Sequence, residues 1–356
     1  MTRPDSLEEI IHSIQPLDPT WIDKARQRTD QLVMPPRALG RLHDLAEQLC
    51  AVQQTLEPRI ETKAVLIMAG DHGVARDGVS AFPQEVTGAM VATFLAGGAG
   101  INAIARHVDA QVRVVDMGIF PEISPQSVDG GHCLRVSKIG RGTASFVDGP
   151  AMTHDQARQA VLTGFAHAAD LFRDGVEVIG TGDMGIGNTT PSAAIGAVIT
   201  GAHLDDMVGR GTGVDDAGLG RKKEVVARAL SANNPDPGDG LDVLAKVGGF
   251  EIGGIAGTAL AGAYYRKPVV IDGFISTAGA LIAQSLCPRV TAYLIAGHQS
   301  EEPGHKLMLK HLGLTPVLDL GMRLGEGTGG ALAMSIIGGA LRVFREVMTF
   351  AEAGIH

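Results

Sequence analysis

Short apolar runs alternate with longer segments of helical periodicity along most of the chain. The continuous apolar run Ala64 to Ala69 is typical of a strand buried in a parallel sheet, and the mainly apolar segments Val112 to Met117 and Val176 to Ile179 are also predicted to be strands. Shorter runs predict further strands over Val269 to Ile271, Ala292 to Ala296, and Val317 to Leu318. Because strands and helices alternate, the pattern predicts an α/β fold with a doubly wound, mainly parallel sheet.

Apolar periodicity places helices between these strands and at both ends of the chain. The predicted inner helices cover residues 84–95, 100–107, 155–172, 219–230 and 241–264, the last with a break at Gly248-Gly249. Residues 1–57 are also predicted to be helical, with a break at Met34-Pro35-Pro36. A final helix, Thr328 to Met348, is long and apolar enough to pack against this N-terminal pair.

The segment Val176 to Ser192, VEVIGTGDMGIGNTTPS, predicts a strand that runs into a glycine-rich turn and then a helix. The turn contains Gly180, Gly182, Gly185 and Gly187, and Asn188 to Thr190 offer N-cap side chains. Such a turn suits a phosphate, although it matches neither the P-loop nor the dinucleotide fingerprint. Asp183 within the turn would bind a sugar hydroxyl, hold a cation or face away. The alternative is a tight connection that binds no ligand.

Polar residues follow other predicted strands, where ligands bind in open α/β sheets. Asp71-His72 is either an acid–base pair, a metal site or a hydrogen-bonded turn. GHQSEEPGH (Gly297 to His305) lacks the H-E-x-x-H zinc pattern and a G-x-S-x-G elbow, so phosphate or substrate contact is expected there. Glu326, between Gly325 and Gly327 ahead of the last helix, is either a helix-dipole partner or a desolvated general base.

The amino-acid composition and net charge exclude several classes of function. The 356 residues include 48 glycines, well above the usual share of ~7 %, which indicates many close-packed turns. A net charge of -9 without a long basic run argues against nucleic-acid binding. Cys50, Cys133 and Cys287 form neither a disulfide framework nor a zinc pattern, so a reducing, cytoplasmic setting is expected. Neither a signal peptide nor a membrane-spanning apolar stretch is predicted.

Several motifs together resemble a known family over nearly the whole chain. They are GDHGV (Gly70 to Val74), SAFPQEVT (Ser80 to Thr87), GDMGIGNTTPSAAI (Gly182 to Ile195), GTGVDD (Gly211 to Asp216), GHQSEEPGH, and LGEGTGGALA (Leu324 to Ala333). This set resembles the nicotinate-nucleotide:dimethylbenzimidazole phosphoribosyltransferase family of cobalamin synthesis. The resemblance implies a homodimer with a Rossmann-like large domain over residues 58–334. It also implies a small helical domain of residues 1–57 with 335–356.

The same resemblance implies transfer of phosphoribose from nicotinate mononucleotide to a benzimidazole nitrogen, with inversion and with neither a metal nor another cofactor. It implies that Glu326 is the general base and that Asp183 is a second catalytic carboxylate. The implied nucleotide and phosphate contacts are Gly185, Ile186, Gly187, Asn188, Gly211, Thr212, Lys222 and Ser300. The implied acceptor pocket consists of Ser80, Phe82, Met184 and Leu324.

Three departures from the family pattern leave alternatives open. Asp183 stands where the family often has Glu, and Gly88-Ala89 precede Met90 where a Gln usually lies near the acceptor. The N-terminal block keeps Leu39 to Leu42 but loses the preceding Lys and Gly-Ser. The alternatives are a paralogue that uses a purine, another benzimidazole or a phenol, and a sensor that binds a nucleotide without turnover.

Overall fold

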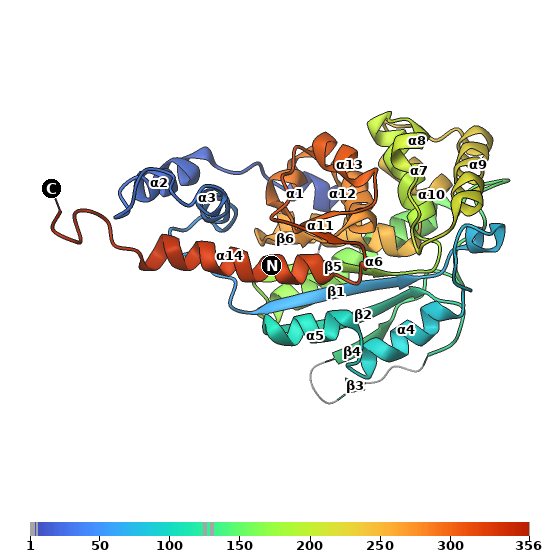
Figure 1. Cartoon of the computed structure of the whole chain (residues 1–356), viewed down its shortest axis with the longest axis horizontal. Coiled ribbons are helices and arrows are strands. Elements are labelled where there is room, and N and C mark those ends of the chain that lie inside the picture. The colour runs from blue at the N-terminus through green and yellow to red at the C-terminus, as the bar shows by residue number, and fades with distance from the viewer. Residues whose placement is uncertain (1–3, 5, 124–126, 129–131, 356) are drawn as a thin grey trace.

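A seven-stranded sheet forms the centre of the computed structural model, which describes residues 4, 6–123, 127–128 and 132–355 (Figure 1). The strand order is β3-β4-β2-β1-β5-β6-β7, parallel throughout except for β3 against β4. The strands are β1 (Lys63–Gly70), β2 (Ala110–Gly118), β3 (Ser127–Val128), β4 (His132–Val136), β5 (Val178–Met184), β6 (Val269–Ile271) and β7 (Leu294–Ala296). The predicted doubly wound α/β fold is therefore confirmed.

One predicted strand lies outside this sheet. The run at Val317 to Leu318 becomes part of β9 (Leu318–Met322), which pairs with β8 (His298–Ser300) in a separate parallel sheet. The chain folds this way because Val317 N–H donates to the carbonyl of Ala296 at the end of β7, which joins β9 to the segment that follows β7.

Helices cover both faces of the main sheet. They are α1 (Leu7–Ser13), α2 (Pro19–Thr29), α3 (Arg41–Gln53), α4 (Val86–Leu95), α5 (Gly100–His107), α6 (His154–Arg173), α7 (Thr189–Thr200), α8 (Leu204–Met207), α9 (Asp216–Asn233), α10 (Gly240–Val247), α11 (Phe250–Tyr265), α12 (Phe274–Leu286), α13 (His305–Leu312) and α14 (Thr328–Glu346). Alternate residues of β1 face opposite layers: Leu66 packs in the cluster with α6, α11 and α12, and Ile67 in the cluster with α4 and α5.

The glycine-rich segment differs from the prediction in one respect. Gly180, Gly182 and Asp183 lie inside β5, so the turn before α7 is shorter than expected. These two glycines serve close packing rather than turning. A Cβ on Gly180 would lie 2.8 Å from Met334 Cε of α14, and one on Gly182 would lie 2.6 Å from the carbonyl oxygen of Glu326. Glycine thus lets α14 and the loop before it approach the sheet.

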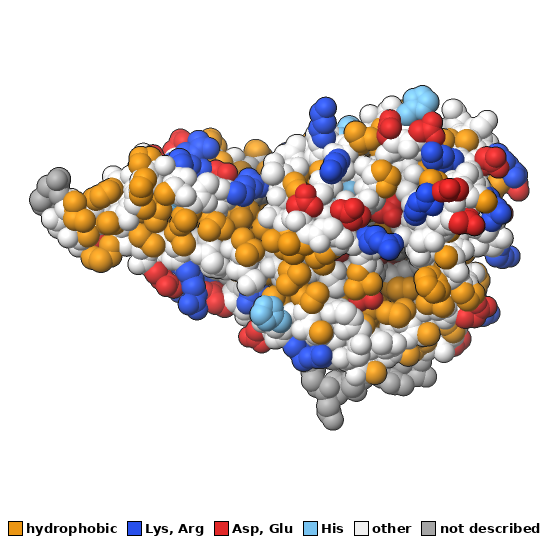
Figure 2. Space-filling model, viewed as in Figure 1, with side chains coloured by type: hydrophobic (Ala, Val, Ile, Leu, Met, Phe, Trp, Pro, Cys, Tyr) orange, Lys and Arg blue, Asp and Glu red, His pale blue; other side chains and the backbone are white. Residues whose placement is uncertain are grey.

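The two chain ends meet in a wing beside the sheet. Residues of α2 and α3 share a hydrophobic cluster with α14, whereas α1 packs in the main core that contains α11 (Figure 1). On the face drawn in Figure 2, hydrophobic side chains gather over this wing, and charged side chains gather over the part of the molecule that holds α8, α9 and α13. The division into domains of residues 1–57 with 335–356 and 58–334 stays a prediction.

Within the described residues, one stretch, Val86–His107, is long and apolar enough to cross a membrane by length and composition alone. Of its apolar 18-residue window, 44% is buried inside the protein. The stretch consists of α4 and α5, which are separate helices joined by residues 96–99, and both contribute to the hydrophobic cluster that covers β1 and β2.

Helices α6 and α11 cross at unusually close range. A Cβ on Gly164 of α6 would overlap the Gly254 carbonyl of α11, and one on Gly257 would overlap the Val161 carbonyl. Because backbone atoms line both contacts, no side-chain rearrangement can make room.

Gly164→Ala is therefore expected to lower the free energy of unfolding by about 1–3 kcal/mol through overpacking. The matched control is Gly220→Ala in α9, where a Cβ meets nothing within 4 Å. That change should leave stability unchanged or raise it by up to about 1 kcal/mol, because Ala favours helices. Urea unfolding compares the variants, and equal midpoints would refute the close-packing interpretation.

Candidate active site

A cavity of ≈ 710 Å³ opens beyond the carboxyl ends of β5 and β6. It adjoins the border of β1 and β5, where the strand order switches direction, which is the usual ligand position in open α/β sheets. Most of the predicted site residues line it. They are Phe82, Asp183, Met184, Gly185, Ile186, Asn188, Gly211, Thr212, Ser300, Leu324 and Glu326.

Three predicted site residues are not among the cavity's lining. Gly187, with φ 90°, lies against Ala75 instead. Ser80 lies behind the lining, with its Oγ 3.1 Å from Thr212 Oγ1. Lys222 lies beneath Gly211, where a Cβ would be 2.9 Å from the lysine Nζ. The structure thus brings Ser80 and Lys222 next to the cavity, and the roles of all three stay predictions.

Glu326 lies in a loop of three successive left-handed residues ahead of α14. The φ angles are 79° at Gly325, 62° at Glu326 and 91° at Gly327. A left-handed non-glycine residue costs about 1–2 kcal/mol, so the surroundings must hold it in place. The Asp272 carboxylate does so, because it accepts hydrogen bonds from Gly327 N–H (3.2 Å) and Gly330 N–H (2.9 Å).

The Glu326 side chain is nearly buried, with 5% exposed, and its Oε2 accepts a hydrogen bond from Ile101 N–H at 3.1 Å. Burial raises the pKa of Glu326; the Ile101 N–H opposes this rise and the Asp272 carboxylate adds to it. A carboxylate with a raised pKa is a better general base. Both carboxylates face a helix N-terminus: Asp272 accepts N–H groups at the start of α14, and Glu326 accepts one in the first turn of α5. The helix-dipole alternative therefore holds for Glu326 in part, with α5 rather than α14 as the helix, and Glu326 also lines the cavity.

Asp183 is buried apart from the edge that it presents to the cavity. Burial raises its pKa to about 8, and the nearby carboxylates of Asp272, Glu251 and Glu326 add to the rise. Asn188 Nδ2–H donates to Asp183 Oδ2 at 2.9 Å, which partly offsets it. Asn188 is the N-cap residue of α7, one of the three positions predicted, but its side chain bonds to Asp183 and makes no capping hydrogen bond. Near neutral pH, Asp183 can carry a proton and donate a hydrogen bond.

One end of the cavity is suited to an anion. Lys222 of α9 is 1% exposed, and its ammonium donates to Thr189 Oγ1 at 2.8 Å. An ammonium has three protons, so it retains donors for a ligand. Burial lowers the pKa of Lys222 to about 8, and the Glu302 carboxylate opposes this fall. The backbone of Gly211, at φ 53°, lies directly over this cation.

Two hydroxyl residues at this end are tied to neighbouring elements. Ser300 N–H donates to His305 Nδ1 at 2.8 Å, which fixes β8 against α13. Thr212 Oγ1 accepts from Ala81 N–H at 3.0 Å, which fixes the glycine loop of residues 209–213 against the segment that carries Phe82. The anion end of the cavity is therefore connected to the wall that contains Phe82.

The other end of the cavity is apolar. Phe82 and Leu324 stand at its rim with 53% and 59% of their surfaces exposed. Further apolar lining comes from Val86, Met90, Met184, Phe274 and Ile275. This end suits a flat aromatic molecule, because it offers apolar side chains on several sides and a carboxylate, Glu326, at the boundary.

The sequence analysis gave no role to Asp272. It expected phosphate or substrate contact from the motif GHQSEEPGH but gave no separate role to His298 or Glu302. Asp272 directly follows β6, as Asp71 follows β1, and an aspartate at the end of a predicted strand was the available signal in the sequence. His298 lines the cavity 3.6 Å from Asp272 Oδ1, and within the described part of the chain neither ring nitrogen has a hydrogen-bond partner.

Asp71 and His72 form a hydrogen-bonded turn rather than part of the cavity wall. His72 Nε2 lies 2.8 Å from Glu251 Oε1, both fully buried, and Asp71 Oδ2 accepts from Phe120 N–H at 2.7 Å. Burial lowers the pKa of His72, but the Glu251 carboxylate outweighs it and raises the pKa overall. Throughout the described residues, no group of three His, Cys, Asp or Glu side chains is placed to hold a metal.

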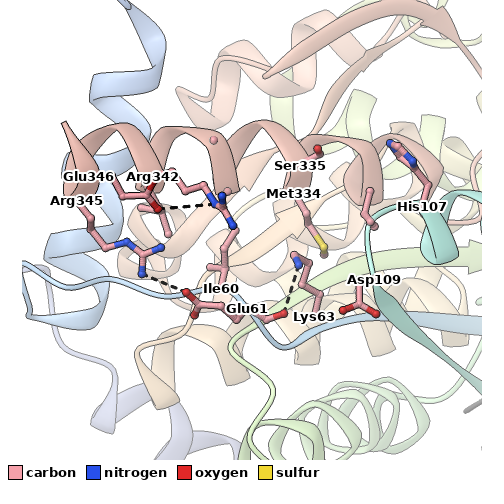
Figure 3. A pocket seen from close by; sticks show the side chains of 14 residues that line it. Ile60, Glu61, Lys63, His107, Asp109, Met334, Ser335, Arg342, Arg345 and Glu346 are labelled. Atoms are coloured by element: carbon pink, nitrogen blue, oxygen red, sulfur yellow. Dashed lines mark hydrogen bonds and ion pairs between the residues drawn. The ribbon is translucent and has the colours of Figure 1, made fainter.

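A second cavity, of ≈ 670 Å³, lies at the opposite, amino ends of β1 and β2. Figure 3 shows Arg345 of α14 reaching Glu61, with which it forms an ion pair at 3.1 Å, and Arg342 directed to Glu346 of the same helix. Its ionic groups are largely paired with one another on the surface, so the cavity at the carboxyl ends of the strands is the candidate active site.

Comparison with known proteins agrees with this geometry. A family model described as phosphoribosyltransferase matches residues 14–355. Nicotinate-nucleotide--dimethylbenzimidazole phosphoribosyltransferases of Roseiflexus sp. (strain RS-1) and Chloroflexus aurantiacus are 53% and 51% identical, and each match covers 98–99% of both chains. The crystal structure of CobT from Thermus thermophilus superposes with a TM-score of 0.90 at 46% identity, covering 95% of this chain and 99% of that one. The chain therefore belongs to the nicotinate-nucleotide:dimethylbenzimidazole phosphoribosyltransferase family.

Proposed function

We propose that this enzyme transfers 5-phosphoribose from nicotinate mononucleotide to 5,6-dimethylbenzimidazole, yielding α-ribazole 5′-phosphate and nicotinate for cobalamin synthesis. The carrying observation is the buried Glu326 carboxylate, held by a left-handed loop between an apolar and a cationic end of one cavity. The names of the relatives supply the identity of the two substrates.

The nucleotide phosphate occupies the cationic end, where Lys222 and the Gly211-Thr212 backbone meet Ser300. The ribose then lies along the turn from Asp183 to Asn188, and a protonated Asp183 donates to a sugar hydroxyl. The acceptor ring fills the apolar end between Phe82, Met184 and Leu324. This order places C1′ of the ribose near Glu326.

The chemistry needs little more than alignment and one base. The lone pair of a ring nitrogen of the acceptor forms a bond to C1′, while the bond from C1′ to the pyridinium nitrogen breaks. That electron pair neutralises the pyridinium, so nicotinate leaves without an acid. Glu326 accepts the N–H proton that the acceptor ring loses. Holding both rings on opposite faces of C1′ lowers the barrier further through orientation.

The assembly and the cellular setting are part of the same proposal. The wing leaves large hydrophobic side chains exposed, among them Met348 with 51% of its surface, and a second copy would cover them in a homodimer. The wing of residues 1–57 with 335–356 would then act as the small domain. The three cysteines are free, which suits a reducing cytoplasm.

Incubation of the purified enzyme with nicotinate mononucleotide and a panel of aromatic acceptors is expected to release nicotinate fastest with dimethylbenzimidazole. Chromatography would identify the nucleotide product. Faster release with a purine or a phenol would identify a paralogue with another acceptor. Tight binding of the nucleotide without any release would identify a sensor instead.

Glu326→Gln is expected to lower kcat by about 10²–10⁴-fold, the usual contribution of a general base. The amide oxygen can still accept from Ile101 N–H, so nucleotide affinity should persist in calorimetry. The exposed Glu301→Gln serves as the control and should retain full turnover. Near-normal turnover of Glu326→Gln would remove Glu326 from the mechanism.

Light scattering is expected to give a mass in solution of twice the 37.0 kDa chain. Met348→Lys should shift this equilibrium toward single chains, since a charge there would be buried by the partner. A mass of one chain at micromolar concentration for the unmodified protein would contradict the homodimer.

A further inference from the structure

Glu302 is a buried carboxylate at the anion end that the mechanism above does not use. It follows β8, and its Oε1 accepts from Gly211 N–H at 2.8 Å. A Cβ on Gly209 would overlap its Oε2, so the glycine loop of residues 209–213 packs directly on the carboxylate. Among the described residues, Oε2 has no hydrogen-bond partner. Glu302 therefore holds the loop whose backbone lines the anion end.

Glu302 also faces the cations of the same region. Glu302 and Lys222 both lie against Gly211: Glu302 Oε1 accepts its N–H at 2.8 Å, and a Cβ on Gly211 would lie 2.9 Å from the lysine Nζ. At this range the Glu302 carboxylate favours the charged form of Lys222, and the cations of Lys222 and Arg323 favour the charged form of Glu302. The Lys222 ammonium donates to the hydroxyl of Thr189, which is neutral and supplies no counter-charge. An ammonium that is 1% exposed needs a counter-charge to stay protonated, and Glu302 is the group placed to supply it.

We propose that Glu302 is a positioning residue of the phosphate end. It holds the glycine loop through Gly211 N–H, and it keeps the Lys222 ammonium charged until a bound phosphate supplies the counter-charge instead. This inference rests on the proposed placement of the nucleotide phosphate beside Lys222. Glu302 repels a bound phosphate, so it also limits nucleotide affinity.

Glu302→Gln separates the two roles of the side chain. The amide has the same size and its oxygen can still accept from Gly211 N–H, so only the negative charge is lost. Without that charge the pKa of Lys222 falls below its present value of about 8. Nucleotide binding needs the protonated lysine and weakens as pH rises through this pKa, so the weakening should begin at lower pH in the variant.

The test is the dissociation constant of nicotinate mononucleotide from about pH 6.5 to 9, taken as a ratio to the unmodified enzyme at each pH. This ratio cancels the ionisation of the phosphate itself. The variant should bind as tightly or tighter at the acid end of this range, because a like charge is gone. The variant should bind about tenfold more weakly near pH 8, where its lysine has lost the proton. The curves of dissociation constant against pH for the variant and the unmodified enzyme should therefore cross.

Matched variants make each outcome decisive. Glu301→Gln, at an exposed neighbouring position, should leave the pH dependence of the dissociation constant unchanged. Glu302→Asp keeps the charge, so its alkaline limb, the weakening of binding at high pH, should begin at the same pH as in the unmodified enzyme. An unchanged ratio for Glu302→Gln, or equal weakening at every pH, would overturn the proposal and leave Glu302 a structural residue. If the unmodified enzyme shows no alkaline limb and Lys222→Met still binds normally, the phosphate placement itself is wrong.

Discussion

The hydrogen bonds from Gly327 and Gly330 N–H to the Asp272 carboxylate are the constraint on which the site depends. They connect the end of β6 to the start of α14 and so hold the preceding residues in the left-handed region. The backbone of Glu326 is thereby held against the sheet, and its side chain is nearly buried where it lines the cavity. Burial is the main cause of the raised pKa values of Glu326 and Asp183, and the Asp272 carboxylate adds to both, so one structural carboxylate contributes to the geometry and to the basicity of its neighbours.

Close backbone approach is the second requirement. The loop that carries Glu326 rests on Gly182 of β5, and Gly211 lies over Lys222 at the cationic end of the cavity. A side chain at either position would push a functional group out of place. Gly182 in β5, like Gly164 and Gly257 between α6 and α11, thus serves close backbone packing rather than a turn.

The sequence was sufficient for the fold because buried parallel strands have short continuous apolar runs. The run at Val269 to Ile271 coincides with β6, and the break at Gly248-Gly249 separates α10 from α11 as expected. The amphipathic pattern could not reveal α12, whose first turns are buried on all sides. The glycine-rich segment was predicted to place Gly180 and Gly182 in a turn. A glycine that makes room for a distant helix cannot be told apart in the sequence from a glycine that allows a bend.

The candidate site was predictable where motif and chemistry coincide, as at Asp183 and Glu326. It was not predictable where a residue acts through tertiary contacts. The capping role of Asp272 depends on α14, more than fifty positions later in the chain, and the hydrogen bond from Gly211 N–H to Glu302 joins two loops that lie about ninety positions apart. The position of a carboxylate in the sequence does not indicate which backbone N–H groups it will meet.

A crystal structure of the enzyme with nicotinate mononucleotide and an unreactive acceptor analogue tests the central claim most directly. The account predicts a Glu326 carboxylate oxygen within about 2.6–3.2 Å of an acceptor ring nitrogen, directly or through one water, with C1′ facing the same ring. A Glu326 side chain turned away from the acceptor, or C1′ beyond its reach, would contradict the account.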